Sequence, residues 1–219
     1  MHVVIPFAAK SPKTRLASVL DLNERREFAV AMLKDVLDII KRTSHTLELL
    51  VGEQTSSLIK PYFEDTLPPI VAHDGTLSEA VNSRLDAQFD TVQPTGGVAV
   101  IMADLALLTV SAVNKLHTSD GDVVLAPGRG GGTNAFITRS SRFTVNYHGL
   151  SYQDHCEIAK KANLSFTTVD SMRLSTDIDE PDDLIEIRLH GDGYSHEWLK
   201  AHGFEIHSQT GRAAIIRRE

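Results

Sequence analysis

Apolar residues recur along the chain in short, nearly continuous runs separated by longer segments with helical spacing. Residues 98–102 form the most evenly apolar run, which is typical of a strand buried on both faces of a sheet. This alternation predicts one sizeable α/β domain. Strands are expected at residues 1–7, 47–51, 70–72, 98–102, 123–126, 135–138, 143–145, 166–169, 204–206 and 213–216. Helices are expected at residues 23–42, 56–63, 76–89, 106–115, 151–161, 181–189 and 195–202.

Several of the expected helices carry a signal at their first residue. Asn23 is a plausible N-cap for the longest helix, which has one continuous apolar stripe. Thr76 with Glu79, and Ser151 with Asp154, have the spacing of capping boxes. Each such helix begins with free backbone N–H groups, which can bind an anion or simply open a helix.

Length and composition exclude some classes of protein. A chain of 219 residues with a net charge of −7 lacks the basic surface of a general nucleic-acid binder. No apolar run reaches 18 residues, so we expect no membrane-spanning segment. The single cysteine, Cys156, suits a reducing cytoplasm. We take residues 1–219 as a single domain in which residues 191–219 form a C-terminal extension.

A cationic segment follows the first expected strand. Lys10, Lys13 and Arg15 lie within six residues of one another. Such a loop can bind a polyphosphate, but charged loops of this kind are also common on protein surfaces. The spacing alone leaves both interpretations open.

Carboxylates lie at the end of one buried strand and in a later extended segment. Asp104 follows the apolar run at 98–102, and Asp177 and Asp179 lie two residues apart. Carboxylate oxygens are the ligands that Mg²⁺ takes alongside substrate phosphates. Capping of the helices that follow is the alternative for all three acids.

A glycine-rich segment at residues 127–134 follows the strand expected at 123–126. Four glycines in five positions allow a backbone to approach a ligand closely, with Arg129 and Thr133 beside them. The segment is neither a Walker A loop nor a dinucleotide fingerprint, and a flexible hairpin is an equally good interpretation.

Taken together, these segments resemble the 2-phospho-L-lactate guanylyltransferase family of coenzyme F420 biosynthesis. The resemblance covers about residues 1–190 and is most specific at residues 126–134. The matching segments are Lys-Ser-Pro-Lys-Thr-Arg-Leu at 10–16, Asp-Gly at 74–75, Ala-Asp-Leu at 103–105, Ala-Pro-x-Arg-Gly-Gly-Gly-Thr-Asn at 126–134, Gly-x-Ser at 149–151 and Asp-Ile-Asp-x-Pro-x-Asp-Leu at 177–184.

The resemblance implies a three-layer fold of the nucleotide-diphospho-sugar-transferase type, with a mixed, mostly parallel sheet flanked by helices. It also implies transfer of GMP from GTP to 2-phospho-L-lactate. We expect Mg²⁺ as cofactor, a cytoplasmic location, and a homodimer, because the segment after Asp192 is too apolar and too detached from the site to be left solvated. Three groups of site residues follow from the family's motifs. Lys10, Lys13 and Arg15 would bind the triphosphate and act in catalysis together with Asp104. Asp104 would also be a metal ligand, with Asp177 and Asp179. The nucleotide would contact Asp74, Gly75, Glu79 and Arg129, and the acceptor would contact Thr133, Gly149 and Ser151.

Two positions depart from the family pattern. Ala106 stands where the family often has Pro, which changes the bend after the strand. Gly128 stands where the family often has Asp, which removes a carboxylate beside the glycine-rich segment. The acceptor is therefore less certain than the reaction, and phosphoenolpyruvate, 3-phosphoglycerate or a sugar phosphate are alternatives. A non-catalytic nucleotide-binding regulator is the alternative outside enzymes.

Overall fold

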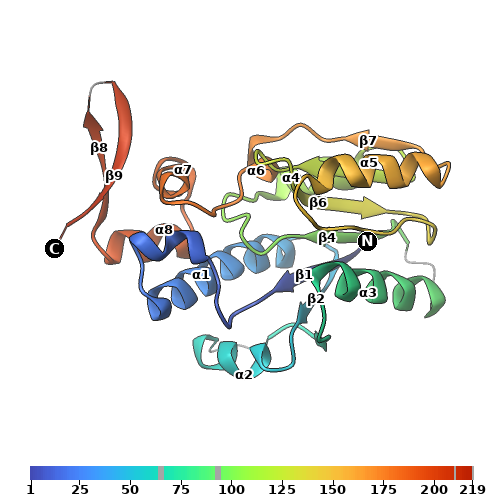
Figure 1. The fold of residues 1–219 in the computed structure, drawn as a ribbon, viewed down its shortest axis with the longest axis horizontal. Helices are drawn as coiled ribbons and strands as arrows, with labels where there is room; N and C mark the ends of the chain where they lie inside the picture. The colour runs from blue at the N-terminus through green and yellow to red at the C-terminus, as the bar shows by residue number, and fades with distance from the viewer. Residues whose placement is uncertain (64–66, 92–94, 210, 219) are drawn as a thin grey trace.

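The computed structural model describes residues 1–63, 67–91, 95–209 and 211–218. A seven-stranded sheet forms its centre, and a separate two-stranded hairpin lies near the C-terminus (Figure 1). The strands of the large sheet are β1 (His2–Phe7), β2 (Thr46–Val51), β3 (Ile70–Ala72), β4 (Val98–Ile101), β5 (Val123–Pro127), β6 (Thr133–Thr138) and β7 (Phe166–Thr168). The hairpin strands are β8 (Phe204–Gln209) and β9 (Arg212–Arg217).

The order of the large sheet is β3-β2-β1-β4-β6-β5-β7. Strand β6 runs antiparallel to both β4 and β5, whereas the other pairs are parallel. The predicted mixed, mostly parallel sheet is therefore confirmed. Because β6 is reversed, it begins at the edge of the sheet where the parallel strands end.

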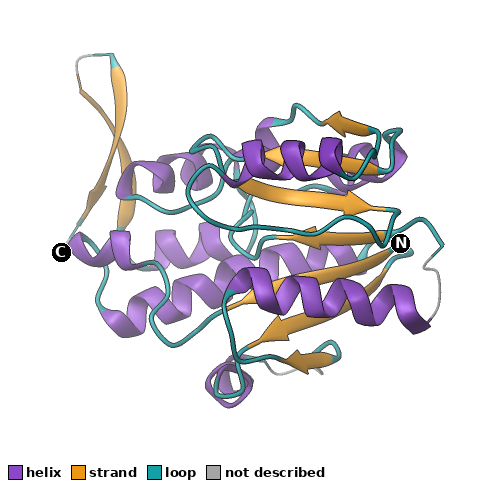
Figure 2. Ribbon diagram, turned by 45° about the vertical axis from the view of Figure 1, so that its right-hand side comes forward, coloured by secondary structure: helices purple, strands orange, loops and turns teal. Residues whose placement is uncertain are grey.

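Helices cover both faces of this sheet, which gives the three predicted layers (Figure 2). Successive residues of β1 enter different cores, since Val3 and Ile5 pack with α1 and α4 while Val4 packs with α3 and α5. The helices are α1 (Leu22–Lys41), α2 (Thr55–Ile59), α3 (Leu77–Thr91), α4 (Val110–Thr118), α5 (Ser151–Lys161), α6 (Met172–Ser175), α7 (Leu184–His190) and α8 (Tyr194–Ala201). Three 3₁₀ turns are η1 (Thr14–Ser18), η2 (Lys60–Tyr62) and η3 (Pro181–Asp183).

Several predicted boundaries are wrong. Helix α1 is capped by Asp21 rather than Asn23, because Glu24 completes a capping box with Asp21. The helix expected at 106–115 begins only at Val110, where the side chain of Thr109 accepts the N–H of Ala112. The described residues 143–145 form no strand, and helix α6 was not expected.

The predicted capping box of Thr76 and Glu79 is confirmed. The Thr76 N–H donates to the Glu79 carboxylate at 2.8 Å, and the Glu79 N–H donates to the Thr76 hydroxyl at 3.3 Å. The predicted box at Ser151 is wrong, because the N-cap of α5 is Leu150 and the Ser151 hydroxyl is used elsewhere.

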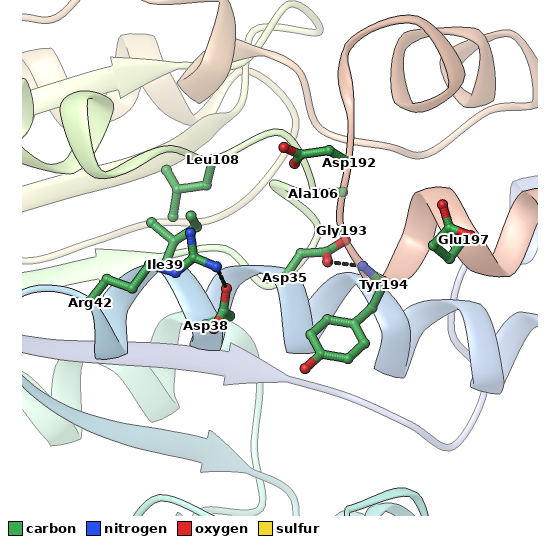
Figure 3. Close-up of a pocket in the computed structure, with 10 residues that line it drawn as sticks. All are labelled: Asp35, Asp38, Ile39, Arg42, Ala106, Leu108, Asp192, Gly193, Tyr194 and Glu197. Atoms are coloured by element: carbon green, nitrogen blue, oxygen red, sulfur yellow. Dashed lines mark hydrogen bonds and ion pairs between the residues drawn. The ribbon is translucent and has the colours of Figure 1, made fainter.

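The C-terminal extension is attached to the domain through a carboxylate on α1. Asp35 accepts a hydrogen bond from the N–H of Tyr194 at 2.5 Å (Figure 3). It also accepts the N–H of Ser195 at 3.0 Å and the Ser195 hydroxyl. A side chain of α1 thereby caps α8 across 160 residues of sequence. Burial raises the pKa of Asp35 to about 6, although these hydrogen bonds oppose the shift. A cavity of about 460 Å³ lies beside this contact.

The hairpin β8–β9 projects beyond α8, away from the large sheet (Figure 1). Arg217 ties its base to the domain through an ion pair with Glu24, and it also lies over the ring of Phe204. Ile216 keeps 40% of its surface exposed. No helix within the described part of the chain is long and apolar enough to cross a membrane.

Candidate active site

The predicted site residues gather at one edge of the large sheet. The parallel strands β1, β2, β3, β4, β5 and β7 end there, and the antiparallel strand β6 begins there. In open α/β sheets, ligands bind in the crevice outside the carboxyl ends of the strands. The topology therefore brings together segments that lie up to 170 residues apart in the sequence.

An ion-pair cluster centred on Lys13 lies at the middle of this edge. The Lys13 ammonium donates to Asp104 at 2.6 Å and to Asp179 at 2.7 Å. Arg15 contacts the other oxygen of Asp179 at 3.4 Å. Burial alone would lower the pKa of Lys13, but the two carboxylates outweigh it and raise that pKa, so the side chain stays charged.

The backbone of Lys13 is in the left-handed region, with φ of 51°. This conformation costs a residue with a Cβ atom on the order of 1 kcal/mol. It persists because the side chain, only 11% exposed, is held by two carboxylates. A strained, mostly buried cation between two acids is typical of a functional site.

Asp177 lies near this cluster but has a different partner. Its carboxylate accepts the amide N–H of Asn134 at 3.0 Å, and the same amide group also donates to the carbonyl of Leu174. Burial raises the pKa of Asp177, and the negative charges of Asp104 and Asp179 raise it further. A cation placed among the three acids would relieve this repulsion.

One carboxylate oxygen at the same place is available to a divalent cation. The Oδ1 atom of Asp104 is buried and has no hydrogen-bond partner among the described residues, which leaves one carboxylate oxygen free for a ligand. Across the same residues, however, no group of three or more His, Cys, Asp or Glu side chains converges on one metal position. The magnesium ligands Asp104, Asp177 and Asp179 therefore stay a prediction.

The glycine-rich segment is a tight turn attached to the acidic segment. Gly128 and Gly132 are joined by a backbone hydrogen bond, and the Arg129 N–H donates to the carbonyl of Ser175. The Arg129 guanidinium forms an ion pair with Asp183 at 2.6 Å. Asp183 also accepts the N–H of Asp179 at 3.0 Å, so it connects this turn to a predicted metal ligand.

Gly128 lies tightly against the side chain of Asn134. A Cβ atom at this position would overlap the side-chain amide of Asn134. Asn134 in turn holds Asp177, as described above. A side chain at position 128 would therefore require Asn134 to move.

Two of the three predicted acceptor-binding residues form a buried network. The Thr133 N–H donates to the Ser151 hydroxyl at 3.0 Å, and the Thr133 hydroxyl lies 2.8 Å from Nδ1 of His155. Thr133 and Ser151 are each 3% exposed, and His155 is fully buried. Gly149 lies apart in an exposed turn, with a positive φ of 45°.

Two of the four predicted nucleotide-binding residues, Asp74 and Gly75, lie at a separate hollow at the ends of β2 and β3, whereas Arg129 lies at the glycine-rich turn with Asp183. A cavity of about 490 Å³ there is lined by Asp74 and Gly75, and also by Lys10. Asp74 accepts the N–H of Glu53 at 3.1 Å, while Glu79 is occupied by its capping box. Lys10 thus lies at this cavity, whereas Lys13 lines a smaller one of about 230 Å³ with Asp104 and Asp179.

Three residues of the site were missed as functional candidates in the sequence. Asp183 and Asn134 belong to the recognised segments, but only their partners in space reveal what they hold. His155 lies near an expected helix start, and lone histidines there are common. No local pattern indicates its contact with Thr133, 22 residues earlier.

The seven-stranded sheet and its two helical layers match the fold of nucleotide-diphospho-sugar transferases. A crystal structure from Desulfovibrio desulfuricans G20, named for such transferases, superposes with a TM-score of 0.75 at 16% identity over 92% of this chain and 96% of that one. A 4-diphosphocytidyl-2C-methyl-D-erythritol synthase superposes with a TM-score of 0.56 at 14% identity over 87% of this chain and 97% of that one. At these identities the likeness supports the fold alone.

Residues 1–218 match the family described as guanylyl transferase CofC like, and the chain belongs to this family. Proteins named 2-phospho-L-lactate guanylyltransferase are similar over their full length. The one from Halomicrobium mukohataei is 46% identical over 99% of this chain and 100% of the relative. The one from Methanospirillum hungatei is 41% identical over 98% of this chain and 93% of the relative.

Proposed function

We propose that this protein transfers GMP from GTP to 2-phospho-L-lactate, giving lactyl-2-diphospho-5'-guanosine and pyrophosphate in coenzyme F420 biosynthesis. The observation that carries the proposal is the full-length similarity, at up to 46% identity, to relatives named for this reaction. The cluster of Lys13, Asp104 and Asp179 supports it, because it supplies the charges that such a transfer needs.

The acceptor needs no general base. A phosphate monoester has a second pKa of about 6, so near neutral pH it is largely a dianion. One of its oxygens forms a bond to the α-phosphorus of GTP. The bond between that phosphorus and the oxygen that bridges it to the β-phosphorus breaks. The electron pair leaves with pyrophosphate. The difficulty is the approach of two polyanions, so positioning and charge stabilisation supply the catalysis.

The cations of the first loop would offset this repulsion. Lys13 lies closest to the acids and would move between the carboxylates and the triphosphate. Arg15, which is 66% exposed and held at one acid only, would bind the leaving pyrophosphate. Lys10 would bind the triphosphate from the side of the larger cavity.

A divalent metal ion is the cofactor that the acids would hold. The free Oδ1 atom of Asp104 and the raised pKa of Asp177 support a cation at this place. Asp104, Asp177 and Asp179 would bind Mg²⁺, which when bound neutralises charge on the triphosphate. The Lys13 ammonium donates to two of these acids, so it lies beside the place where the cation would bind.

The two substrates would occupy neighbouring parts of the edge. The cavity lined by Asp74 and Gly75 has the volume for a base, and Glu79 would keep the helix beside it in place. Arg129 would contact the nucleotide's phosphates once released from Asp183. Thr133, Gly149 and Ser151 would bind the phosphate and carboxylate of the acceptor.

A pyrophosphate assay tests this proposal. With Mg²⁺, we expect pyrophosphate release with GTP and 2-phospho-L-lactate, and loss of that release when EDTA is added. Phosphoenolpyruvate, 3-phosphoglycerate and glucose 1-phosphate serve as alternative acceptors, and ATP, CTP and UTP as alternative donors. Release with another acceptor alone would replace 2-phospho-L-lactate, and release with no pair would favour a regulator that only binds nucleotide.

The C-terminal extension, residues 191–219, is proposed as a dimerisation element of a single-domain enzyme. A two-stranded hairpin is marginally stable in water by itself, and β8–β9 projects from the domain (Figure 1). A second copy would cover it. We expect light scattering to give twice the chain mass of 24.0 kDa, and a shorter protein ending after Ala201 to give one chain mass. A full-length mass of one chain would contradict the dimer.

The location follows from the substrates and from Cys156. The proposed donor GTP is a metabolite of the cytoplasm. Cys156 is a free thiol, which suits a reducing compartment. We therefore place the enzyme in the cytoplasm.

A further inference from the structure

His155 is a buried titratable group for which the reaction described above has no use. It lies on α5 beneath the glycine-rich turn, and its ring packs edge-on against Tyr147, with centroids 5.1 Å apart. Phe136 and Phe143 lie against the same ring. This aromatic surround fixes the orientation of the imidazole, and it leaves the two ring nitrogens as the only polar atoms to satisfy.

The hydrogen bonds of the ring determine which nitrogen carries the proton. The backbone N–H of Asn146 donates to Nε2 at 3.0 Å, so Nε2 must be the acceptor. A neutral imidazole then carries its hydrogen on Nδ1, where the Thr133 hydroxyl oxygen lies 2.8 Å away. Burial lowers the pKa of His155 to about 4, against a smaller opposing effect of Asp154, so the ring is neutral near pH 7.

The tautomer of His155 fixes the direction of the Thr133 hydroxyl. Since Nδ1–H donates to Thr133 Oγ1, the hydroxyl hydrogen of Thr133 cannot point back at the ring. Ser151 is constrained in the same way, because its oxygen accepts the Thr133 N–H. Both hydroxyl hydrogens are therefore left to donate outside this network, beside the glycine-rich turn at the start of β6.

We propose that His155 is a positioning residue that orients the Thr133 hydroxyl to donate to an anionic oxygen of the acceptor. The inference rests on the proposed function, because Thr133 was assigned to the acceptor there. It adds a residue that touches neither substrate and acts only through another side chain. The chemistry recognised is a phosphate or carboxylate oxygen, which accepts hydrogen bonds and cannot donate them when ionised.

A double-mutant cycle tests this inference. His155→Leu removes the hydrogen bond, and Thr133→Val removes the hydroxyl at nearly the same volume. We expect His155→Leu to raise KM for 2-phospho-L-lactate about tenfold, as for the loss of one hydrogen bond to a charged group, and to leave KM for GTP within about twofold. In the Thr133→Val background, His155→Leu should have no further effect on KM for the acceptor.

Two more variants control for folding. His155→Asn keeps an N–H donor at the position of Nδ1, so we expect KM for the acceptor to stay within about threefold of wild type. Cys156→Ser changes the neighbouring residue on the same helix and should leave both KM values unchanged. If His155→Leu does not fold, the same cycle is run with His155→Asn, which should change KM for the acceptor by no more than about threefold in each Thr133 background.

The outcomes separate this inference from the proposed function. Suppose that the wild-type enzyme turns over a phospho-acid. If His155→Leu and Thr133→Val then act additively on KM for the acceptor, or if His155→Leu raises KM for GTP as much as KM for the acceptor, only the positioning role is overturned. The positioning role would also be overturned if His155→Asn raised KM for the acceptor as much as His155→Leu does. If the wild type turns over no phospho-acid, the proposed function fails and this inference fails with it.

Discussion

Replacing Asp104 by Asn is expected to lower kcat on the order of a thousandfold while the protein stays folded. The substitution keeps the size of the side chain but removes one of the two charges that surround the Lys13 ammonium. It also removes the carboxylate whose free Oδ1 atom is proposed to bind Mg²⁺. Loss of one preorganised charged group at a phosphoryl-transfer site costs about 10²–10³ in kcat.

The measurement is pyrophosphate release at saturating GTP and acceptor, over a range of Mg²⁺ concentrations. Circular dichroism against temperature checks the fold, which we expect to survive because Asp104 is partly exposed and Lys13 keeps Asp179 as a partner. Asp86→Asn is the matched control, since Asp86 is an exposed carboxylate on α3. A folded Asp104→Asn enzyme with near-normal turnover would contradict the metal assignment.

The positions of most strands were predictable because their signals are local, whereas the mixed arrangement of the sheet came from the resemblance. A buried strand reads as a run of apolar residues whatever its neighbours are, and the run at 98–102 became β4. Asp104, which follows this strand, therefore had to lie at the edge of the sheet where the parallel strands end. Boundaries were less predictable where two residues compete for the same role. Asp21 and Asn23 are both good caps, and only the placement of Glu24 decides between them.

Contacts between distant segments were not predictable from single segments. Ser151 has the spacing of a cap, yet its hydroxyl accepts the N–H of Thr133 instead. Asp35 lies on an apolar helix with no signal that it would cap α8. In each case the partner is chosen by tertiary packing, which brings together groups with no fixed separation in the sequence. The resemblance predicts which acids and cations would form the site, but it does not reveal that Lys13 bridges two of the acids.

This bridge leads to a prediction in which metal binding and catalysis change in opposite directions. Lys13→Met keeps the length of the side chain and removes its charge. The ammonium now lies 2.6 and 2.7 Å from two proposed metal ligands, so it competes with a divalent cation for them. We therefore expect Lys13→Met to bind Mn²⁺, used as a probe for Mg²⁺, more tightly than wild type in the absence of nucleotide. The gain should be about tenfold or more, since removal of one like charge within about 4 Å of a cation contributes about 1.4 kcal/mol or more.

Turnover should fall in the same variant by about 10²–10³, because the cation that would stabilise the triphosphate is gone. Arg15→Met is the matched control: Arg15 is mostly exposed and contacts one acid at 3.4 Å, so both effects should be smaller. Calorimetric titration with Mn²⁺ and pyrophosphate release measure the two quantities on the same protein. Weaker Mn²⁺ binding in Lys13→Met would show that Lys13 organises the acids for the metal rather than competing with it, and unchanged kcat would remove Lys13 from the catalytic residues. Only a carboxylate pair that the ammonium and the metal ion share gives tighter binding together with lost turnover.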